Sequence, residues 1–178
     1  MLFLALTIGI VLISRKNILH PNSHGFPRMF GWIGIAWLFD RNWTAWFENP
    51  LSALQLSSWF LLGLSAYLVL VALVDFRRFG KIDSSRQEHH LFFFEKTTNL
   101  IDQGIYGYIR HPMYASLIAL SWGITLKAPG LPELFVCFAC TYLFYLTARL
   151  DEKECLTYFG DTYLSYKNRT KMFLPYLF

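Results

Sequence analysis

The sequence predicts an all-α integral membrane bundle of about five transmembrane helices, followed by a cytosolic C-terminal helix. Three observations lead to this fold class. Only 16% of residues are charged, against 54% hydrophobic and 19% aromatic, whereas soluble domains carry about 25% charged residues. The uncharged run Pro50–Val74 is longer than the ~20 residues with which a helix crosses a bilayer. The Lys and Arg residues gather in alternate connections, as the positive-inside rule requires.

Four shorter apolar segments accompany this run: Met1–Ser14, Phe26–Phe39, Pro112–Leu126 and Leu134–Ala148. Each forms roughly 21 Å of helix, so any one of them alone could be an interfacial or re-entrant helix. Their order, with polar connections between them, favours five spans whose ends are extended by Lys, Arg and Trp side chains. The first segment lacks the basic leader and the small-residue cleavage site of a signal peptide.

The charge pattern tests this map independently. Of the 16 Lys and Arg residues, three lie in 15–28, six in 75–111 and five from Arg149 onward. The two remaining connections hold only Arg41 and Lys127. This alternation places the N-terminus outside and the C-terminus in the cytosol, so we expect a multi-pass protein with its polar half in the cytosol.

The length suits one domain, 1–178, with N-terminal helices in 1–75 and a catalytic half in 76–178. The connection between Asp75 and Arg110 is long for a compact protein, which indicates a function. The basic residues form no continuous patch, so we expect the bilayer as partner and no nucleic acid. Neither Cys137 with Cys140 nor the Glu88–His90 stretch has the additional ligands of a metal site, and we predict none. The two cysteines are expected to be small core residues.

Beyond Arg149 the last span is expected to continue as a helix through "DEKECLTYFGDTYLSYKNR". Apolar residues recur there at three- and four-residue spacing, at Leu156, Phe159, Tyr163 and Tyr166. Such a stripe can lie on the membrane surface or fold back against the bundle.

Polar residues concentrate where the fourth span begins, in "GIYGYIRHPMY" (104–114). Pro112 suits a first helical turn, where its missing N–H is not needed. Arg110, His111 and Tyr114 then lie near one face at the mouth of this helix. They either anchor the helix end at the interface or form part of a site.

A second cluster, "RLDEKE" (149–154), ends the fifth span. A short turn, "APGLPEL", joins the fourth and fifth spans, so they should be antiparallel neighbours with adjacent inner ends. Arg110 and His111 would then lie near Asp151 and Glu152. Carboxylates beside a membrane are costly unless they are solvated, paired or functional. The cluster is therefore either a structural ion pair or a site for a small zwitterionic ligand.

Together these motifs resemble the membrane methyltransferases that use S-adenosylmethionine, namely the isoprenylcysteine carboxyl methyltransferases and the phospholipid N-methyltransferases. Their pattern G-x-Y-x-x-x-R-H-P-x-Y is matched by Gly104, Tyr106, Arg110, His111, Pro112 and Tyr114. The later E-E, F-G-x-x-Y-x-x-Y and R-x-x-x-x-x-P blocks are matched by Glu152, Phe159, Gly160, Tyr163, Tyr166, Arg169 and Pro175. The resemblance covers the chain from about residue 75 to its end.

The resemblance implies a cytosolic cofactor pocket for S-adenosylmethionine and a lipid-like or prenylated acceptor at the membrane surface. The positions that match the family's cofactor pocket are Leu100, Ile101, Tyr106, Arg110, His111, Pro112, Met113, Tyr114, Asp151 and Glu152. The candidate catalytic residues are His111 and Glu152, either of which can take a proton from an amine acceptor. Arg149 is added, on position alone, as an anchor for an anionic group of the acceptor.

Three departures from the pattern weaken the prenylcysteine assignment more than the methyltransferase assignment. Asp151 replaces the first glutamate, the histidine before the glycine block is replaced near Thr98, and Lys171 stands in the region where a proline follows the tail arginine. The C-terminus also resembles NADPH-dependent membrane sterol reductases, through Asp151, Cys155 and the final Pro175–Tyr176. A reductase and a non-catalytic membrane protein therefore remain as alternatives.

Overall fold

The computed structural model describes residues 1–80 and 99–177. Its helices are α1 (Leu2–Ile13), α2 (Arg15–Ile18), α3 (Gly25–Asn42), α4 (Ala53–Phe79), α5 (Pro112–Thr125), α6 (Leu131–Phe159) and α7 (Asp161–Arg169), with the 3₁₀ turn η2 (Gly104–Gly107) before α5. In these two ranges there is no strand, only an isolated parallel bridge between Ile109 and Lys171. The all-α fold class is therefore confirmed.

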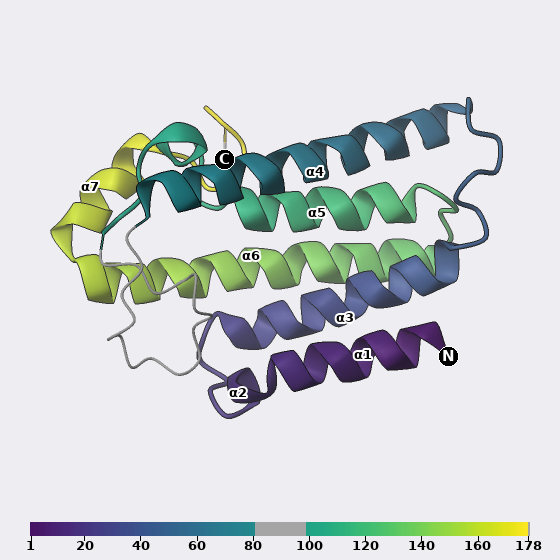
Figure 1. The fold of residues 1–178 in the computed structure, drawn as a ribbon, viewed down its shortest axis with the longest axis horizontal. Helices are drawn as coiled ribbons and strands as arrows, with labels where there is room; N and C mark the ends of the chain where they lie inside the picture. Colours follow the sequence, from purple (N-terminus) through teal and green to yellow (C-terminus); the bar gives the residue numbers. More distant parts are fainter. Residues whose placement is uncertain (81–98, 178) are drawn as a thin grey trace.

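The long helices lie side by side in the order α1, α3, α6, α5, α4 (Figure 1). One end of the bundle carries η2, the start of α5 and α7, and we call it the site end. The other carries the N-terminus and the α5–α6 turn, and we call it the turn end. The expected antiparallel pairing of α5 and α6 is confirmed, so the residues before Pro112 and those after Ala148 meet at the site end.

Small residues let the helices approach closely. A side chain at Gly123 of α5 would come within 2.9 Å of Leu62 on α4, and one at Gly31 of α3 would come within 2.7 Å of Phe144 on α6. Such close backbone approach is typical of helices that pack in a membrane. The main core cluster contains Cys137, Cys140 and Phe144, which confirms that the two cysteines are core residues.

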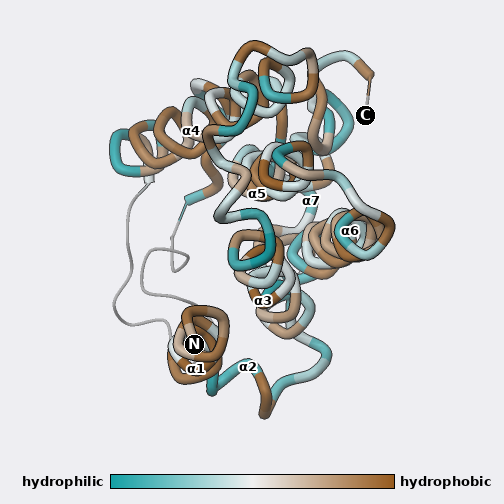
Figure 2. Tube along the Cα trace, turned by 90° about the vertical axis from the view of Figure 1, so that its right-hand side faces the viewer, coloured by the Kyte–Doolittle hydropathy of each residue, from teal (hydrophilic) through white to brown (hydrophobic). Residues whose placement is uncertain are grey.

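Two helices, α4 and α6, are long and apolar enough to cross a membrane. The apolar window of α4 is only 11% buried, and its exposed side chains include Phe60, Leu70 and Val74. Figure 2, coloured by hydropathy, shows hydrophobic residues along much of the traces of α1 and α4. A helix from the core of a soluble protein would bury these side chains, so α4 indicates a membrane protein.

Two expected boundaries are wrong. The third span was expected to end at Val74, but α4 continues to Phe79 and brings Asp75 into its last turns. The C-terminal segment was expected to be one helix, but α6 ends at Phe159 and α7 begins at Asp161. Gly160 between them has φ 56°, a conformation that side chains disfavour and that ends a helix. The chain can thus fold α7 back over the site end.

At the turn end, the buried ammonium group of Lys127 holds three segments together. It donates to Gln55 Oε1 at 2.9 Å and lies 3.3 Å from the ring centre of Trp59. Gln55 in turn donates to the carbonyls of Ala45 and Lys127. The start of α4, the connection before it and the α5–α6 turn are joined in this way, which gives the cation both a hydrogen bond and an aromatic face.

Candidate active site

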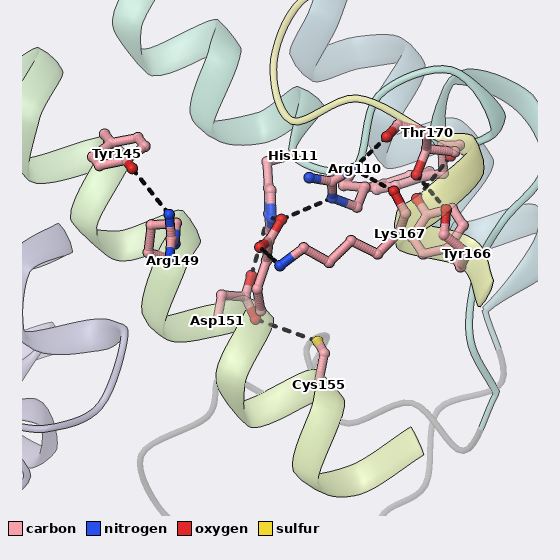
Figure 3. Close-up of polar contacts among 11 residues, drawn as sticks. Arg110, His111, Tyr145, Arg149, Asp151, Cys155, Tyr166, Lys167 and Thr170 are labelled. Atoms are coloured by element: carbon pink, nitrogen blue, oxygen red, sulfur yellow. Dashed lines mark hydrogen bonds and ion pairs between the residues drawn. The ribbon is translucent and has the colours of Figure 1, made fainter. Parts of the chain in front are cut away.

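The two predicted polar clusters meet at the site end around the carboxylate of Glu152, which is 3% exposed. Arg110 Nε donates to Glu152 Oε1 at 2.8 Å, and Lys167 Nζ of α7 lies 2.6 Å from Oε2 (Figure 3). The ring nitrogens of His111 lie 3.6 Å from Glu152 Oε1 and 3.6 Å from Asp151 Oδ2. The prediction that these inner helix ends converge is therefore confirmed.

Arg110 connects three elements. Besides Glu152 on α6, its guanidinium donates to the carbonyls of Lys167 and Thr170 at the end of α7. These carbonyls have no partner within the helix, so the arginine caps α7 while it orients Glu152. The interaction uses the fixed fork of donors that a lysine cannot offer.

A strap from the C-terminal tail fixes the backbone of the R-H-P segment. Arg110 N donates to Lys171 O at 2.8 Å, His111 N to Met172 O at 3.1 Å, and Lys171 N to Tyr108 O at 3.1 Å. His111 is buried and stacks on Tyr114 with ring centres 5.5 Å apart. The ring is therefore positioned both from its own helix and from the tail.

Opposing effects act on the pKa of Glu152, which lies beyond the apolar part of α6. Burial alone would raise this pKa, but the contacts with His111, Lys167 and Arg110 outweigh burial and lower it to about 2. Burial raises the pKa of Tyr106, Tyr163 and Tyr166. The cluster therefore presents one firmly ionised carboxylate among neutral phenols.

Three buried side-chain atoms of this site have no hydrogen-bond partner among the described residues: Tyr106 Oη, His111 Nε2 and Glu152 Oε2. The last two lie in ion-pair contacts, with Glu152 Oε1 at 3.6 Å and with Lys167 Nζ at 2.6 Å, whereas Tyr106 Oη has no such contact in the described part of the chain. Buried polar groups nearly always have a partner, so each exception needs a reason. All three atoms belong to residues that were predicted to bind a cofactor. Unsatisfied polar groups are what a site for a polar ligand requires.

The remaining predicted residues divide into two sets. In the first set, Ile101 packs with Tyr106 and Ala72, and Met113 packs against this cluster. Leu100, the residue before Ile101, is half-buried, and Pro112 begins α5. Arg149, by contrast, is exposed and donates to Tyr145 Oη at 3.1 Å on its own helix (Figure 3). No described contact joins Arg149 to Glu152.

Sequence reasoning missed Lys167 and Asp75. Lys167 was counted only as a cytosolic cation, and its role depends on the reversal at Gly160. Asp75 was placed at the start of a connection, but its carboxylate accepts from Ile105 N at 2.8 Å. A carboxylate at the end of an apolar helix, where it opposes the helix dipole, was the available signal.

A cavity of ≈ 390 Å³ lies beside the α2–α3 connection, lined by Leu19, His20, Pro21, Asn22, Ser23 and Glu154. Glu154 is two residues after Glu152, which turns it by about 200° to the opposite side of α6. Its carboxylate is bound by the backbone N and the ring Nδ1 of His24 at 2.9 and 2.8 Å. This cavity is thus separate from the Glu152 cluster. No metal-binding group of three residues occurs in 1–80 or 99–177, and the Glu88–His90 stretch lies outside the described residues.

Comparison with known proteins supports the resemblance. A methanethiol S-methyltransferase of Pseudomonas deceptionensis is 29% identical over 153 residues, which are 80% of this chain and 54% of the relative. One from Crocosphaera subtropica is 26% identical over 141 residues, 75% of this chain and 52% of the relative. Human protein-S-isoprenylcysteine O-methyltransferase is 26% identical over 141 residues, 75% of this chain and 49% of the relative.

The chain thus spans about half the length of these curated relatives. No solved structure matches it significantly. The family model for phospholipid methyltransferases matches residues 59–161, which contain η2, α5, the whole of α6 and most of α4. The chain belongs to the phospholipid methyltransferase family.

Proposed function

We propose that the protein is an S-adenosylmethionine-dependent methyltransferase that acts on a lipid-like or prenylated acceptor at the membrane surface. The observation that carries this proposal is the site end itself. A buried carboxylate and two basic side chains gather where α5 begins and α6 leaves its apolar stretch, beside two buried polar atoms, Tyr106 Oη and His111 Nε2, that have no hydrogen bond to any described residue. The family match favours methyl transfer over the NADPH-dependent reductase.

The residues present fit this cofactor. We assign its binding to the predicted set: Leu100, Ile101, Tyr106, Arg110, His111, Pro112, Met113, Tyr114, Asp151 and Glu152. Tyr106 Oη and His111 Nε2 are available for hydrogen bonds. Lys167, whose side chain is 41% exposed, can withdraw into water and leave Glu152 to a cationic or hydroxyl group of the cofactor. When bound, the cofactor supplies an electrophilic methyl group on a sulfonium.

Such a displacement needs little covalent chemistry from the protein. Positioning of the two reactants can contribute up to ~7–11 kcal/mol, and tyrosine rings favour a nearby cation. If the acceptor is an amine, a base must take its proton. Glu152 is a weak base because its pKa is low, so we assign this role to His111. A thiolate or carboxylate acceptor needs no base.

The acceptor is expected to reach the site from the membrane. We propose five spans, of which α4 and α6 are the longest, with the site end in the cytosol. The domain is then one unit in which 1–75 holds the first helices and 76–178 holds the site. Arg149 is exposed beside Tyr145, away from Glu152, so we retain it as an anchor for an anionic group of the acceptor and exclude it from cofactor binding.

The test uses the purified full chain in detergent and calorimetry with S-adenosylhomocysteine, the demethylated product, or NADPH. We expect saturable binding of the former only, and its loss in Glu152→Gln but not in Glu133→Gln. Glu133 is a buried carboxylate at the other end of α6, paired with Arg41, and therefore a matched control. Binding of NADPH alone, or of neither, would contradict the proposal. Membranes incubated with methyl-labelled cofactor, followed by mass spectrometry of the lipid extract, then identify the acceptor.

A further inference from the structure

The 3₁₀ turn η2, which carries Tyr106, is attached to α4 through one side chain. Asp75 Oδ2 accepts a hydrogen bond from the backbone N–H of Ile105 at 2.8 Å. Gly104 lies directly against the same carboxylate, because a Cβ placed on Gly104 would overlap it. Gly104 also has φ +62°, which a residue with a side chain adopts only with strain. The glycine thus meets both a conformational and a steric requirement.

The position of this carboxylate is otherwise unfavourable. Asp75 lies in the last turns of α4, where the helix dipole opposes a negative charge. Arg77 and Arg78, which follow Asp75 in the last turn of α4, already supply the positive charge that favours a helix C-terminus. The hydrogen bond to the turn explains why an aspartate stands there. Accepting a backbone N–H in this way is also how carboxylates cap the start of a helical turn.

Because Tyr106 follows Ile105 in η2, the hydrogen bond from Asp75 also restrains the position of Tyr106. The Tyr106 ring packs on Phe76, the residue after Asp75, with ring centres 6.5 Å apart. Its carbonyl accepts from Tyr166 Oη of α7 at 2.7 Å. Tyr106 is 7% exposed, and its own hydroxyl has no partner among the described residues. The backbone is held from two sides, and the hydroxyl alone is left for a ligand.

We propose that Asp75 is a positioning residue of the cofactor site, acting through Gly104 and Ile105 to hold the Tyr106 hydroxyl in its binding orientation. This inference rests on the proposed function only in naming the ligand of Tyr106. The attachment of the turn to α4 can be tested without any ligand.

The first experiment is hydrogen–deuterium exchange of the ligand-free full chain in detergent. Without its acceptor, the Ile105 amide loses a hydrogen bond to a charged group. In Asp75→Ala we therefore expect exchange of peptides covering 103–108 to rise about tenfold. In Asp75→Asn, which keeps an acceptor oxygen, we expect a rise of only about threefold. Glu48→Ala, an exposed carboxylate before α4, is the matched control and should change nothing in this segment. Unchanged exchange in Asp75→Ala would overturn the proposal.

The second experiment is a double-mutant cycle on Asp75→Ala and Gly104→Ala, with affinity for S-adenosylhomocysteine as readout. Each single change should weaken binding about tenfold or more. The double variant should lose less than the product of the two, because alanine at 104 no longer meets the carboxylate. A purely multiplicative cycle would overturn the steric pairing. A general loss of folding would lower the melting temperature of the whole chain, whereas a positioning role predicts weaker binding at nearly unchanged melting temperature.

The two proposals fail in different ways. If wild-type protein binds no S-adenosylhomocysteine, the proposed function fails, while the exchange experiment still decides whether Asp75 holds the turn. If wild-type binds and Asp75→Ala binds equally well with normal exchange, only the role of Asp75 fails.

Discussion

Each end of the bundle contains a buried cluster built around one charged side chain, Lys127 at the turn end and Glu152 at the site end. The two clusters differ in how completely their polar atoms are hydrogen-bonded. At the turn end, Lys127 has a hydrogen bond to Gln55 and the ring of Trp59, and Gln55 uses its amide on two carbonyls. At the site end, Glu152 is paired with Arg110 and Lys167, but within residues 1–80 and 99–177 neither Tyr106 Oη nor His111 Nε2 has a hydrogen-bond partner.

The difference separates structure from function. A satisfied buried network holds segments together and gains nothing from a ligand. An unsatisfied one is less stable than it would be with apolar side chains, and it gains when a ligand supplies the missing partners. Variants at the turn end should therefore change stability alone, and variants at the site end should change ligand binding as well.

The largest effect is expected for Glu152→Gln. This change leaves Arg110 buried without its charged partner, which costs ~3–5 kcal/mol, and we expect affinity for S-adenosylhomocysteine to fall at least ~100-fold. Calorimetry and thermal unfolding in detergent measure the two effects. Glu133→Gln on the same helix should retain wild-type affinity. Equal affinities in the two variants would contradict the claim that only the site end contributes to ligand binding.

The pH dependence of stability should sharpen this result. The pKa of Glu152 is lowered from 4.5 to about 2 in the folded protein, so its contribution is fully present above pH 4.5 and is lost as the pH falls toward 2. A shift of this size corresponds to about 3 kcal/mol. The difference in melting temperature between wild type and Glu152→Gln should narrow as the pH falls below 4.5. A constant difference from pH 7 to pH 3 would contradict the assignment.

At the turn end, Lys127→Met should lower the free energy of unfolding by about 2 kcal/mol, because it removes a buried hydrogen bond and a cation–π contact while keeping the side-chain stem. Turnover per folded molecule should not change. Arg41→Met, which removes an exposed partner of Glu133, should cost less than ~1 kcal/mol. Lost turnover in folded Lys127→Met would show that the two ends are coupled.

The smallest effect on stability is expected for Tyr106→Phe. The Tyr106 hydroxyl is buried and has no hydrogen bond to a described residue, so its removal should leave the free energy of unfolding of the ligand-free protein unchanged or raise it by up to ~1 kcal/mol. Affinity for S-adenosylhomocysteine should fall about tenfold. Tyr166→Phe is the matched control, because its hydroxyl donates to the Tyr106 carbonyl and its loss should destabilise the protein. A drop in stability for Tyr106→Phe would mean that the hydroxyl has a structural partner.

Much of this arrangement could be predicted from the sequence because it depends on local signals. Apolar length located the helices, and the short α5–α6 turn required that His111 and Glu152 meet. Pro112 marked the start of α5 correctly. These predictions needed only helix geometry and the direction of two neighbouring segments.

The contacts of Lys167 and Asp75 could not be predicted in the same way. Lys167 reaches Glu152 only because Gly160 reverses the chain, and an uninterrupted helix would have carried it away from the site. Asp75 contacts Ile105 because α4 extends past the apolar run. Helix ends are set by tertiary contacts as much as by composition, and both residues lie just beyond such an end.

The tail strap also determines when the site can form. Arg110 and His111 take their backbone partners from Lys171 and Met172, some sixty residues further along the chain. The ribosome must therefore release that stretch before the backbone at the start of α5 can be fixed, although the long apolar helices are synthesised earlier. A chain cut short before Thr170 would lack these backbone partners, and the proposed site could not form.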